Sequence, residues 1–305
     1  MDLQKCTYGV DAVGRGNTYL AAEDSNNLVF QNYSLLSQVN DYRLSLMSTK
    51  ILNEFTYNIL SFSMENWSFG YYGLNESAGD ERDDQGNRGK EIFYSDTNIF
   101  IAYGFSIKNI DLGLRAKYLR KYFSVANETA TGTGLDLAGH YKYNKILSFG
   151  AEISNIYSTG LRWSTGTIEY FPQSLNLGTK MKLFGKDAFY KMYDKQVDLF
   201  ADLRIDQRGS LLHFGAEYWP IKNFVFRLGM DQDYRAKKNN ELGINSKITF
   251  GLGLIYNSFY FDYAYHPYFG LAEETTHYFS ASYRFNLKKV AEIPEDLFMI
   301  HTKIP

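Results

Sequence analysis

This sequence has few of the residues on which several large classes of protein depend. Only one of its 305 residues is cysteine, Cys6, so an intrachain disulfide and a cysteine-rich zinc site are both excluded. With five prolines and 25 glycines, the composition is not that of a disordered or collagen-like chain. The net charge of −2 offers no basic surface for nucleic acid. No apolar run approaches the ~20 residues that a membrane-spanning helix needs.

The residues present in excess are aromatic. Tyrosine occurs 26 times, phenylalanine 23 times and tryptophan three times, which makes 17% of the chain, although the hydrophobic total of 45% is ordinary. These numbers permit a membrane β-barrel, whose alternating strands give no hydropathy peak. Tyrosine is also favoured at membrane–water interfaces. We therefore expect interfacial girdles from tyrosines near strand ends, such as Tyr71, Tyr72, Tyr118, Tyr122 and Tyr256.

Alternation of apolar with polar or small residues is the main structural signal. In residues 244–256 the even positions are almost all apolar, including Ile248, Phe250 and Leu252, whereas the odd positions include Lys247 and Thr249. A period of two is typical of a strand with one apolar face. The pattern predicts fourteen strands, at approximately 41–50, 54–64, 66–74, 92–106, 110–123, 133–143, 146–157, 173–184, 196–206, 210–220, 224–235, 244–256, 259–268 and 275–287.

The lengths of these strands favour a membrane barrel. Most exceed the usual five or six residues and match the roughly 9–11 that a tilted membrane strand needs. The alternative is a soluble, tyrosine-rich barrel or sandwich. It is disfavoured because the apolar face repeats on every strand and no helix is predicted to cover it. The predicted fold class is all-β, a single antiparallel transmembrane barrel in a Gram-negative outer membrane.

The connections between strands give a second, independent indication. After even-numbered strands they are mostly tight, as at 108–109, 144–145, 222–223 and 257–258, and after odd-numbered strands they are mostly longer. Outer-membrane barrels alternate short periplasmic turns with long outer loops in this way. The segment 185–195 is an exception, because it is long where a short turn is expected. An even strand count places both termini on the periplasmic side.

Two regions resemble a known family. Residues 9–36, with Gly9, Ala12, Gly14, Gly16, Tyr19, Ala21, Asp24, Asn32 and Leu36, resemble the N-terminal signature of PorV-type barrels of the FadL superfamily. They depart from it at Asn17, Ser25 and Tyr33. The segments FGAEYWPIKNFVFRLGMD and FYFDYAYHPYFGLAEETTHYFSASYRF resemble hairpins of the same family. The resemblance implies a fourteen-stranded barrel, and between these two regions it rests on the strand pattern alone.

The resemblance implies one of two functions. The first, which we expect, is a component of a protein secretion or surface-attachment assembly, like PorV in type IX secretion. It would act through protein partners at the periplasmic mouth, the tail or the outer loops. The alternative is a FadL-like passive transporter of hydrophobic small molecules. No nucleophile, phosphate-binding or metal-binding motif is complete, so we expect neither an enzyme nor a cofactor.

Charged residues recur on the inward-facing positions of the last six predicted strands. They could form a polar path or ligand site, but both signs are present in similar numbers. We therefore favour a self-neutralising network that fills the lumen, since buried charges must be paired. Its members are Asp198, Asp202, Arg204, Asp206, His213, Glu217, Arg227, Asp231, Lys247, Asp262 and Arg284.

The N-terminal residues 1–40 are expected to form a plug or periplasmic segment before the barrel at 41–287. Gly14 and Gly16 allow tight bends, and Asp24 and Asn32 can hydrogen-bond to an inner wall. A periplasmic cap with ordinary capping residues is the alternative, and the family resemblance favours the plug.

The last predicted unit is a periplasmic tail at 288–305. It carries an apolar patch of Leu297, Phe298, Met299 and Ile300, which could dock a partner. A tail that is disordered or tucked against the mouth of the barrel is an equal alternative. Loop 75–91 is rich in carboxylates, but arginines and a lysine lie among them, so a solvated outer loop is favoured over a calcium site.

Overall fold

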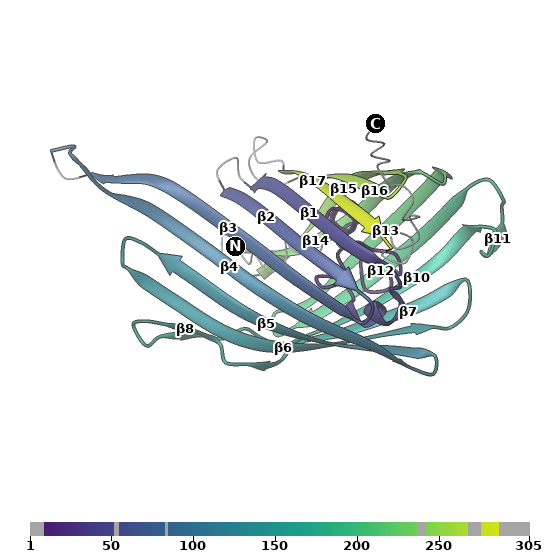
Figure 1. Cartoon of the computed structure of the whole chain (residues 1–305), viewed down its shortest axis with the longest axis horizontal. Coiled ribbons are helices and arrows are strands. Elements are labelled where there is room, and N and C mark those ends of the chain that lie inside the picture. Colours follow the sequence, from purple (N-terminus) through teal and green to yellow (C-terminus); the bar gives the residue numbers. More distant parts are fainter. Residues whose placement is uncertain (1–8, 52–54, 83–84, 237–241, 268–275, 287–305) are drawn as a thin grey trace, which may run out of the picture.

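The chain forms a closed antiparallel β-barrel of fourteen strands (Figure 1). The computed structural model describes residues 9–51, 55–82, 85–236, 242–267 and 276–286. Each strand of the wall pairs with the next along the chain, and β17 returns to pair with β1, for example Leu46 with Ala281. The wall therefore has no free edge, as a barrel in lipid requires. The predicted fold class and strand count are confirmed.

Most of the wall strands have bounds close to those predicted from the sequence, but β3, β4 and β6 extend further at the same end of the barrel. In order around the barrel they are β1 (Tyr42–Ile51), β2 (Phe55–Met64), β3 (Trp67–Arg82), β4 (Arg88–Ile107), β5 (Ile110–Phe123), β6 (Glu128–Lys142), β7 (Leu147–Ser158), β10 (Ser174–Gly185), β12 (Gln196–Asp206), β13 (Gly209–Ile221), β14 (Phe224–Ala236), β15 (Leu242–Tyr256), β16 (Phe259–His266) and β17 (Thr276–Phe285).

Three short strands and two short helices complete the described structure. The strands are β8 (Leu161–Trp163), β9 (Ile168–Glu169) and β11 (Tyr190–Lys191); the first two form a hairpin beside β6. Helix α1 (Val10–Gly14) and the 3-10 helix η2 (Tyr33–Gln38) lie in the N-terminal segment. None of the helices among the described residues is long and apolar enough to cross a membrane.

The two faces of the wall differ as the alternation predicts. On β15, Ile248, Phe250 and Leu252 point outward and are exposed, whereas Lys247 and Thr249 are buried in the lumen. The same division runs around the barrel, so leucine, isoleucine and phenylalanine side chains cover its outer surface. An apolar surface of this extent is unfavourable in water and suits lipid tails.

Most of the two-residue turns lie at one end of the barrel, which we call the turn end; the turn at 207–208, between β12 and β13, lies at the other end. Turns at 108–109, 222–223 and 257–258 each join two strands through two residues. Lys108 and Asn257 adopt positive φ angles of 56° and 54°, as a two-residue hairpin turn commonly requires. The opposite end carries the long hairpin of β3 and β4, which projects furthest in Figure 1 and gives this end its name, the hairpin end.

Two expectations about β3 and β4 are wrong. The segment 75–91 was expected to be a solvated loop, but β3 continues to Arg82 and β4 begins at Arg88, with Asp80 paired to Glu91. Backbone pairing can extend beyond the lipid, where charged side chains are no obstacle. Tyr72 was expected at the interface, but it faces the lumen and is 1% exposed. Its neighbour Tyr71 points the other way because successive side chains alternate in a strand.

One prediction concerns the lipid-facing surface. Replacing Phe250 with arginine should lower the free energy of unfolding by about 2–4 kcal/mol, because the charge lies near mid-membrane. The change Tyr256→Arg lies on the same face at the turn end and should lower it by about 0–1 kcal/mol. Urea titration of the refolded barrel in lipid vesicles measures both. Equal losses would show that this face does not span lipid.

Candidate functional site

The N-terminal segment 9–40, called the plug below, lies inside the barrel. Figure 1 shows it coiled within the strands, and nearly all of its residues are buried. Helix α1 packs against β14, β15, β16 and β17, and η2 packs against β4 and β5. The plug therefore touches two separate regions of the wall.

Glycines on the inner wall let the plug backbone approach closely. A Cβ atom built on Gly150 would lie 2.0 Å from the carbonyl oxygen of Leu20, and one on Gly229 would lie 2.0 Å from the amide nitrogen of Gly16. A Cβ atom built on Gly14 would lie 2.9 Å from the Cα atom of Gly251. Gly16 also has a φ of +70°, which favours glycine. The structure thus places the predicted Gly14 and Gly16 where the plug meets the wall.

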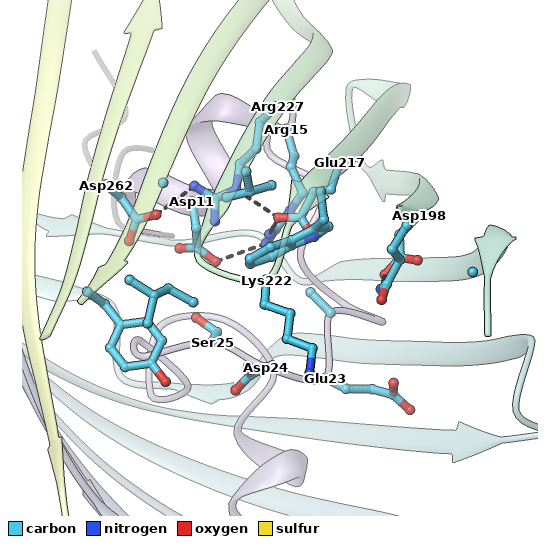
Figure 2. Close-up of a pocket in the computed structure, with 18 of the residues that line it drawn as sticks. Asp11, Arg15, Glu23, Asp24, Ser25, Asp198, Glu217, Lys222, Arg227 and Asp262 are labelled. Atoms are coloured by element: carbon cyan, nitrogen blue, oxygen red, sulfur yellow. Dashed lines mark hydrogen bonds and ion pairs between the residues drawn. The ribbon is translucent and has the colours of Figure 1, made fainter. Parts of the chain in front are cut away.

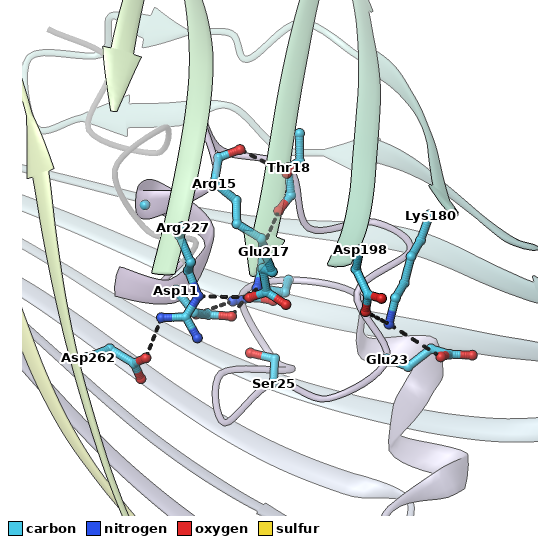
Figure 3. Close-up of polar contacts among 12 residues, drawn as sticks. Asp11, Arg15, Thr18, Glu23, Ser25, Lys180, Asp198, Glu217, Arg227 and Asp262 are labelled. Atoms are coloured by element: carbon cyan, nitrogen blue, oxygen red, sulfur yellow. Dashed lines mark hydrogen bonds and ion pairs between the residues drawn. The ribbon is translucent and has the colours of Figure 1, made fainter. Parts of the chain in front are cut away.

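A chain of buried ion pairs joins the plug to the wall (Figures 2 and 3). Arg15 of the plug contacts Asp11 at 3.0 Å and Glu217 of β13 at 2.6 Å. Glu217 also accepts from Arg227 of β14 at 2.7 Å, and Arg227 contacts Asp262 of β16 at 2.6 Å. These five side chains, called the latch below, alternate in charge, so each buried charge has a partner of opposite sign.

A second group of ion pairs holds the plug against β6 and β10. Lys180 lies 3.2 Å from Asp198 and 3.7 Å from Glu23 (Figure 3). Lys142 lies 2.9 Å from Glu23. Burial by itself raises the pKa of Glu23, but Lys180 and Lys142 outweigh burial and hold it below its usual value. Glu23 is therefore a carboxylate at neutral pH and attracts both lysines.

Two more predicted residues bind the plug backbone. Asp202 of β12 accepts hydrogen bonds from the amides of Tyr19 and Leu20 at 2.9 and 3.2 Å. Arg204, on the same face of β12, donates to the carbonyl oxygen of Asn17 at 3.1 Å. These contacts satisfy polar groups that the plug brings into the lumen.

Asp231 of β14 lies between two buried histidines. Its carboxylate contacts His213 Nδ1 and His266 Nε2, each at 2.8 Å. His213 Nδ1 also lies 3.2 Å from the carbonyl oxygen of Gly16, so this nitrogen faces two acceptors and must carry the proton. His213 thereby connects Asp231 to the plug.

Asp24 and Asn32 of the plug have different environments. Asp24 is largely exposed, with 71% of its side chain accessible, and contacts Arg43 and Arg284. Asn32 is fully buried; its side chain accepts from the amide of Ser34 at 3.1 Å and caps η2. The structure therefore brings Asn32, but not Asp24, into a buried position.

Asp206 lies apart from the rest of the predicted network. It pairs with the exposed Arg208 beside the β12–β13 connection at the hairpin end.

Among the described residues, no group of three or more His, Cys, Asp or Glu side chains is arranged to hold a metal. The patch at Leu297, Phe298, Met299 and Ile300 lies outside the described residues.

A further charged cluster, which was not predicted from the sequence, lies on β5, β6 and β7. Arg115 contacts Asp136 at 2.8 Å and Glu152 at 2.9 Å, and Lys117 contacts Asp136 at 2.8 Å. Arg115 also donates to the plug carbonyl of Val29 at 2.9 Å. The signal was present in the sequence, because these charges occupy inward positions of predicted strands, as the network on the later strands does.

Cavities lie on both sides of the plug. The larger, about 580 Å³, lies at the turn end and is called the vestibule below; Figure 2 shows its lining. The latch forms part of its wall, together with Asp198, Trp219 and Lys222. A smaller cavity of about 120 Å³ lies towards the hairpin end. The plug separates the two.

The smaller cavity adjoins an aromatic cluster inside the barrel. Phe30 of the plug meets Phe100 of β4 edge-on, with ring centroids 5.4 Å apart. Tyr72 lies 5.6 Å from Phe100 and 5.6 Å from Tyr57. Phe30, Tyr72 and Phe100 line the cavity, which charged side chains including Arg115 complete. This is an apolar surface in a lumen that is otherwise largely polar.

Comparison with known proteins identifies the fold. Neither a known protein family nor a curated protein matches this sequence. Solved structures do match. They include the Pseudomonas putida toluene transporter TodX, with a TM-score of 0.57 at 12% identity, and the monoaromatic hydrocarbon channel CymD, with 0.60 at 12%. A FadL homologue of Pseudomonas aeruginosa has a TM-score of 0.51 at 10% identity. Each match covers 92% of this chain and 98% of the other chain.

These likenesses correct the functional expectation. The structures that share this fold along nearly their whole length are hydrocarbon channels and a FadL homologue, so the prediction of a PorV-like secretion component is wrong. The protein partners that it implied stay a prediction. The chain has the fold of FadL-type outer-membrane barrels.

A first prediction from the site concerns the latch. The change Arg227→Ala should lower the free energy of unfolding by about 3–5 kcal/mol, because Glu217 and Asp262 lose a buried partner. Lys145→Ala breaks only the exposed pair with Asp187 and should leave stability near wild type. Thermal unfolding in detergent, followed by circular dichroism, compares the two. A latch variant as stable as wild type would contradict the structural role.

A second prediction concerns the plug–wall contact. Gly150→Ala should displace the plug at Leu20, raise ion conductance in planar bilayers and cost about 1–3 kcal/mol of stability. Gly139→Ala is the matched control, because its Cβ would meet its nearest neighbour at 3.7 Å, an ordinary contact. Equal conductance of the two variants would count against a tightly seated plug.

Proposed function

We propose that this protein is a plugged channel that lets hydrophobic small molecules cross an outer membrane by passive diffusion. The observation that carries the proposal is a closed barrel of the FadL type whose lumen holds a plug between two cavities. The lipid-facing outer surface supports the membrane location. Among the similar structures are channels described as carrying toluene and monoaromatic hydrocarbons.

The orientation of the barrel forms part of the proposal. Short turns face the periplasm in outer-membrane barrels, so the turn end and the vestibule would face the periplasm. With an even number of strands, the first strand would then begin and the last strand would end on that side. The hairpin end, with the aromatic cluster beneath it, would face the outside and meet a solute first.

The aromatic cluster supports an apolar solute. Phe30, Tyr72 and Phe100 pack against one another with ring centroids 5.4 and 5.6 Å apart, and all three line the small cavity, where an aromatic solute would meet them. A cavity of about 120 Å³ suits a solute of the size of a small aromatic ring. Because Phe30 belongs to the plug, a solute here would contact wall and plug together.

Passage to the vestibule requires the plug to move. The plug backbone lies against Gly150 and Gly229 with no space for even a Cβ atom. The latch and the Lys180–Glu23 contact oppose its displacement. A solute that competes for contacts around Phe30 would favour a shifted plug by binding that state better. No energy source is needed, because the solute moves down its own gradient.

Uptake of radiolabelled toluene tests the proposal. Cells that lack their own aromatic channel and produce this protein should take up toluene faster than cells with an empty vector. Phe30→Ala and Phe100→Ala should each lower the rate several-fold, whereas Tyr170→Ala, at an exposed position in the β9–β10 loop, should not. Uptake no faster than the vector control, with barrel folding verified by a heat-dependent shift on gels, would refute the proposal.

Removal of the plug gives a further expected outcome. A chain that lacks residues 1–36 should form barrels with higher conductance in planar bilayers, because the lumen loses the segment that fills it. The Gly139→Ala protein should conduct as wild type does. Unchanged conductance after the deletion would count against a plug.

A further inference from the structure

The connection between β10 and β12 is unlike the other connections at the turn end. Residues 184–195, called the foot below, occupy a place where most neighbouring hairpins turn in two residues. Figure 1 shows β11, within the foot, at the margin of the molecule. The foot folds back on the end of β10: the amides of Phe189 and Met192 donate to the carbonyl oxygens of Lys182 and Gly185 at 3.0 and 2.9 Å.

The foot exposes an unusual density of large apolar side chains. Phe189, Tyr190 and Tyr193 are 62%, 54% and 79% exposed, and Met192 is exposed as well. Phe189 meets Tyr190 edge-on with centroids 4.9 Å apart, and Tyr190 stacks on Phe184 at 5.4 Å. Phe184, Phe189 and Tyr190 thus form one contiguous group. In water such a group would be unfavourable.

The aromatic group continues the lipid-facing surface of the wall. The register shifts between Lys182 and Phe184, so that Phe184 pairs with Val197 of β12. Successive side chains of β12 point to opposite faces, so Val197 lies on the outer face because its neighbour Asp198 is buried in the lumen. Phe184 therefore also lies on that face, and the Tyr190 ring stacked on it extends the apolar belt past the end of the strands.

The segment that carries the aromatic group also carries several exposed lysines. Lys186, Lys191 and Lys195 lie in the foot and are exposed, and Lys145 of the neighbouring turn joins it through a 3.2 Å contact with Asp187. The four lysines outnumber the two aspartates of the foot, Asp187 and Asp194, so the region carries a net positive charge. Aromatic rings with long basic side chains beside them suit the boundary between acyl chains and phosphate groups, where lysine ammonium groups reach the phosphates.

We propose that the foot is a membrane-interface anchor that binds anionic phospholipid headgroups of the leaflet at the turn end. This rests on the outer-membrane setting of the proposed function. Phe189, Tyr190 and Met192 enter the headgroup–acyl boundary, and Lys186, Lys191 and Lys195 contact phosphate oxygens. Because Lys186, Tyr193 and Lys195 also line the vestibule, the anchor holds one side of its rim at the bilayer surface.

The depth of the foot in a bilayer tests the apolar part of the proposal. In a Cys6→Ser background, Phe189→Cys carries a spin label, and the protein is placed in nanodiscs of phosphatidylethanolamine and phosphatidylglycerol. The label should be several-fold less accessible to a water-soluble nickel chelate than a label at Tyr170→Cys, an exposed loop position. Equal accessibility would overturn the anchor. A label protected only after periplasmic extract is added would assign the foot to a protein partner instead.

A third label distinguishes failure of the anchor from failure of the proposed membrane setting. A label at Phe250→Cys reports the lipid-facing belt. If it too is accessible to the chelate, the membrane setting fails and the anchor fails with it. If it is immersed and the foot label is not, the anchor alone is wrong. Neither readout depends on toluene uptake.

Lipid selectivity tests the basic part. Native mass spectrometry of the protein released from these nanodiscs should show retained phosphatidylglycerol. The triple change Lys186→Gln, Lys191→Gln and Lys195→Gln should lower retention at least tenfold, since each lysine near an anionic surface contributes about fivefold in affinity. Lys108→Asn, in another turn at the same end, is the control. Equal retention by the two variants would overturn headgroup binding.

Discussion

Every backbone amide and carbonyl in the wall needs a hydrogen-bond partner within the protein, because lipid supplies none. The pairing of β17 with β1 meets this requirement by closing the sheet. Closure creates an interior whose polar side chains are also cut off from much of the solvent. The other main features of the molecule, its divided faces, its neutralised lumen and its inserted N-terminal segment, follow from that closure.

The lumen shows how a closed barrel accommodates charge. The latch alternates in sign from Asp11 to Asp262, and each of its arginines bridges two carboxylates. The arrangement neutralises the buried groups and also ties the plug to β13, β14 and β16. The same ion pairs thus stabilise the barrel and hold the plug in place, so we expect a change in one latch residue to affect both. The aromatic cluster around Phe100 belongs to a larger group of buried apolar residues and adjoins the opposite side of the plug.

The proposed channel function is supported by two kinds of observation, the similar structures and the geometry of the lumen. Twelve per cent identity to TodX carries the fold alone, and the barrel, plug and cavities of this chain support a channel on their own. A secretion role was inferred from short N-terminal and C-terminal motifs. Those motifs correspond here to glycines against the wall and to strands of the barrel, such as β13 and β16. They describe how a barrel of this kind is built, and therefore do not distinguish what it carries.

The sequence by itself determined the strands, their number and which face of each meets lipid. These are local properties, since side chains alternate along any extended strand and the lipid-facing positions must be apolar. Only the tertiary structure decided which charges meet: Arg15 and Glu217 are 202 residues apart, and their contact depends on how far the plug enters the closed barrel. The tertiary structure also decided which of two adjacent tyrosines faces the lumen. Both were expected at the interface, but Tyr72 points inward and Tyr71 points outward. The cavities also depend on the tertiary structure, because each is lined by residues from many segments that are distant in the sequence.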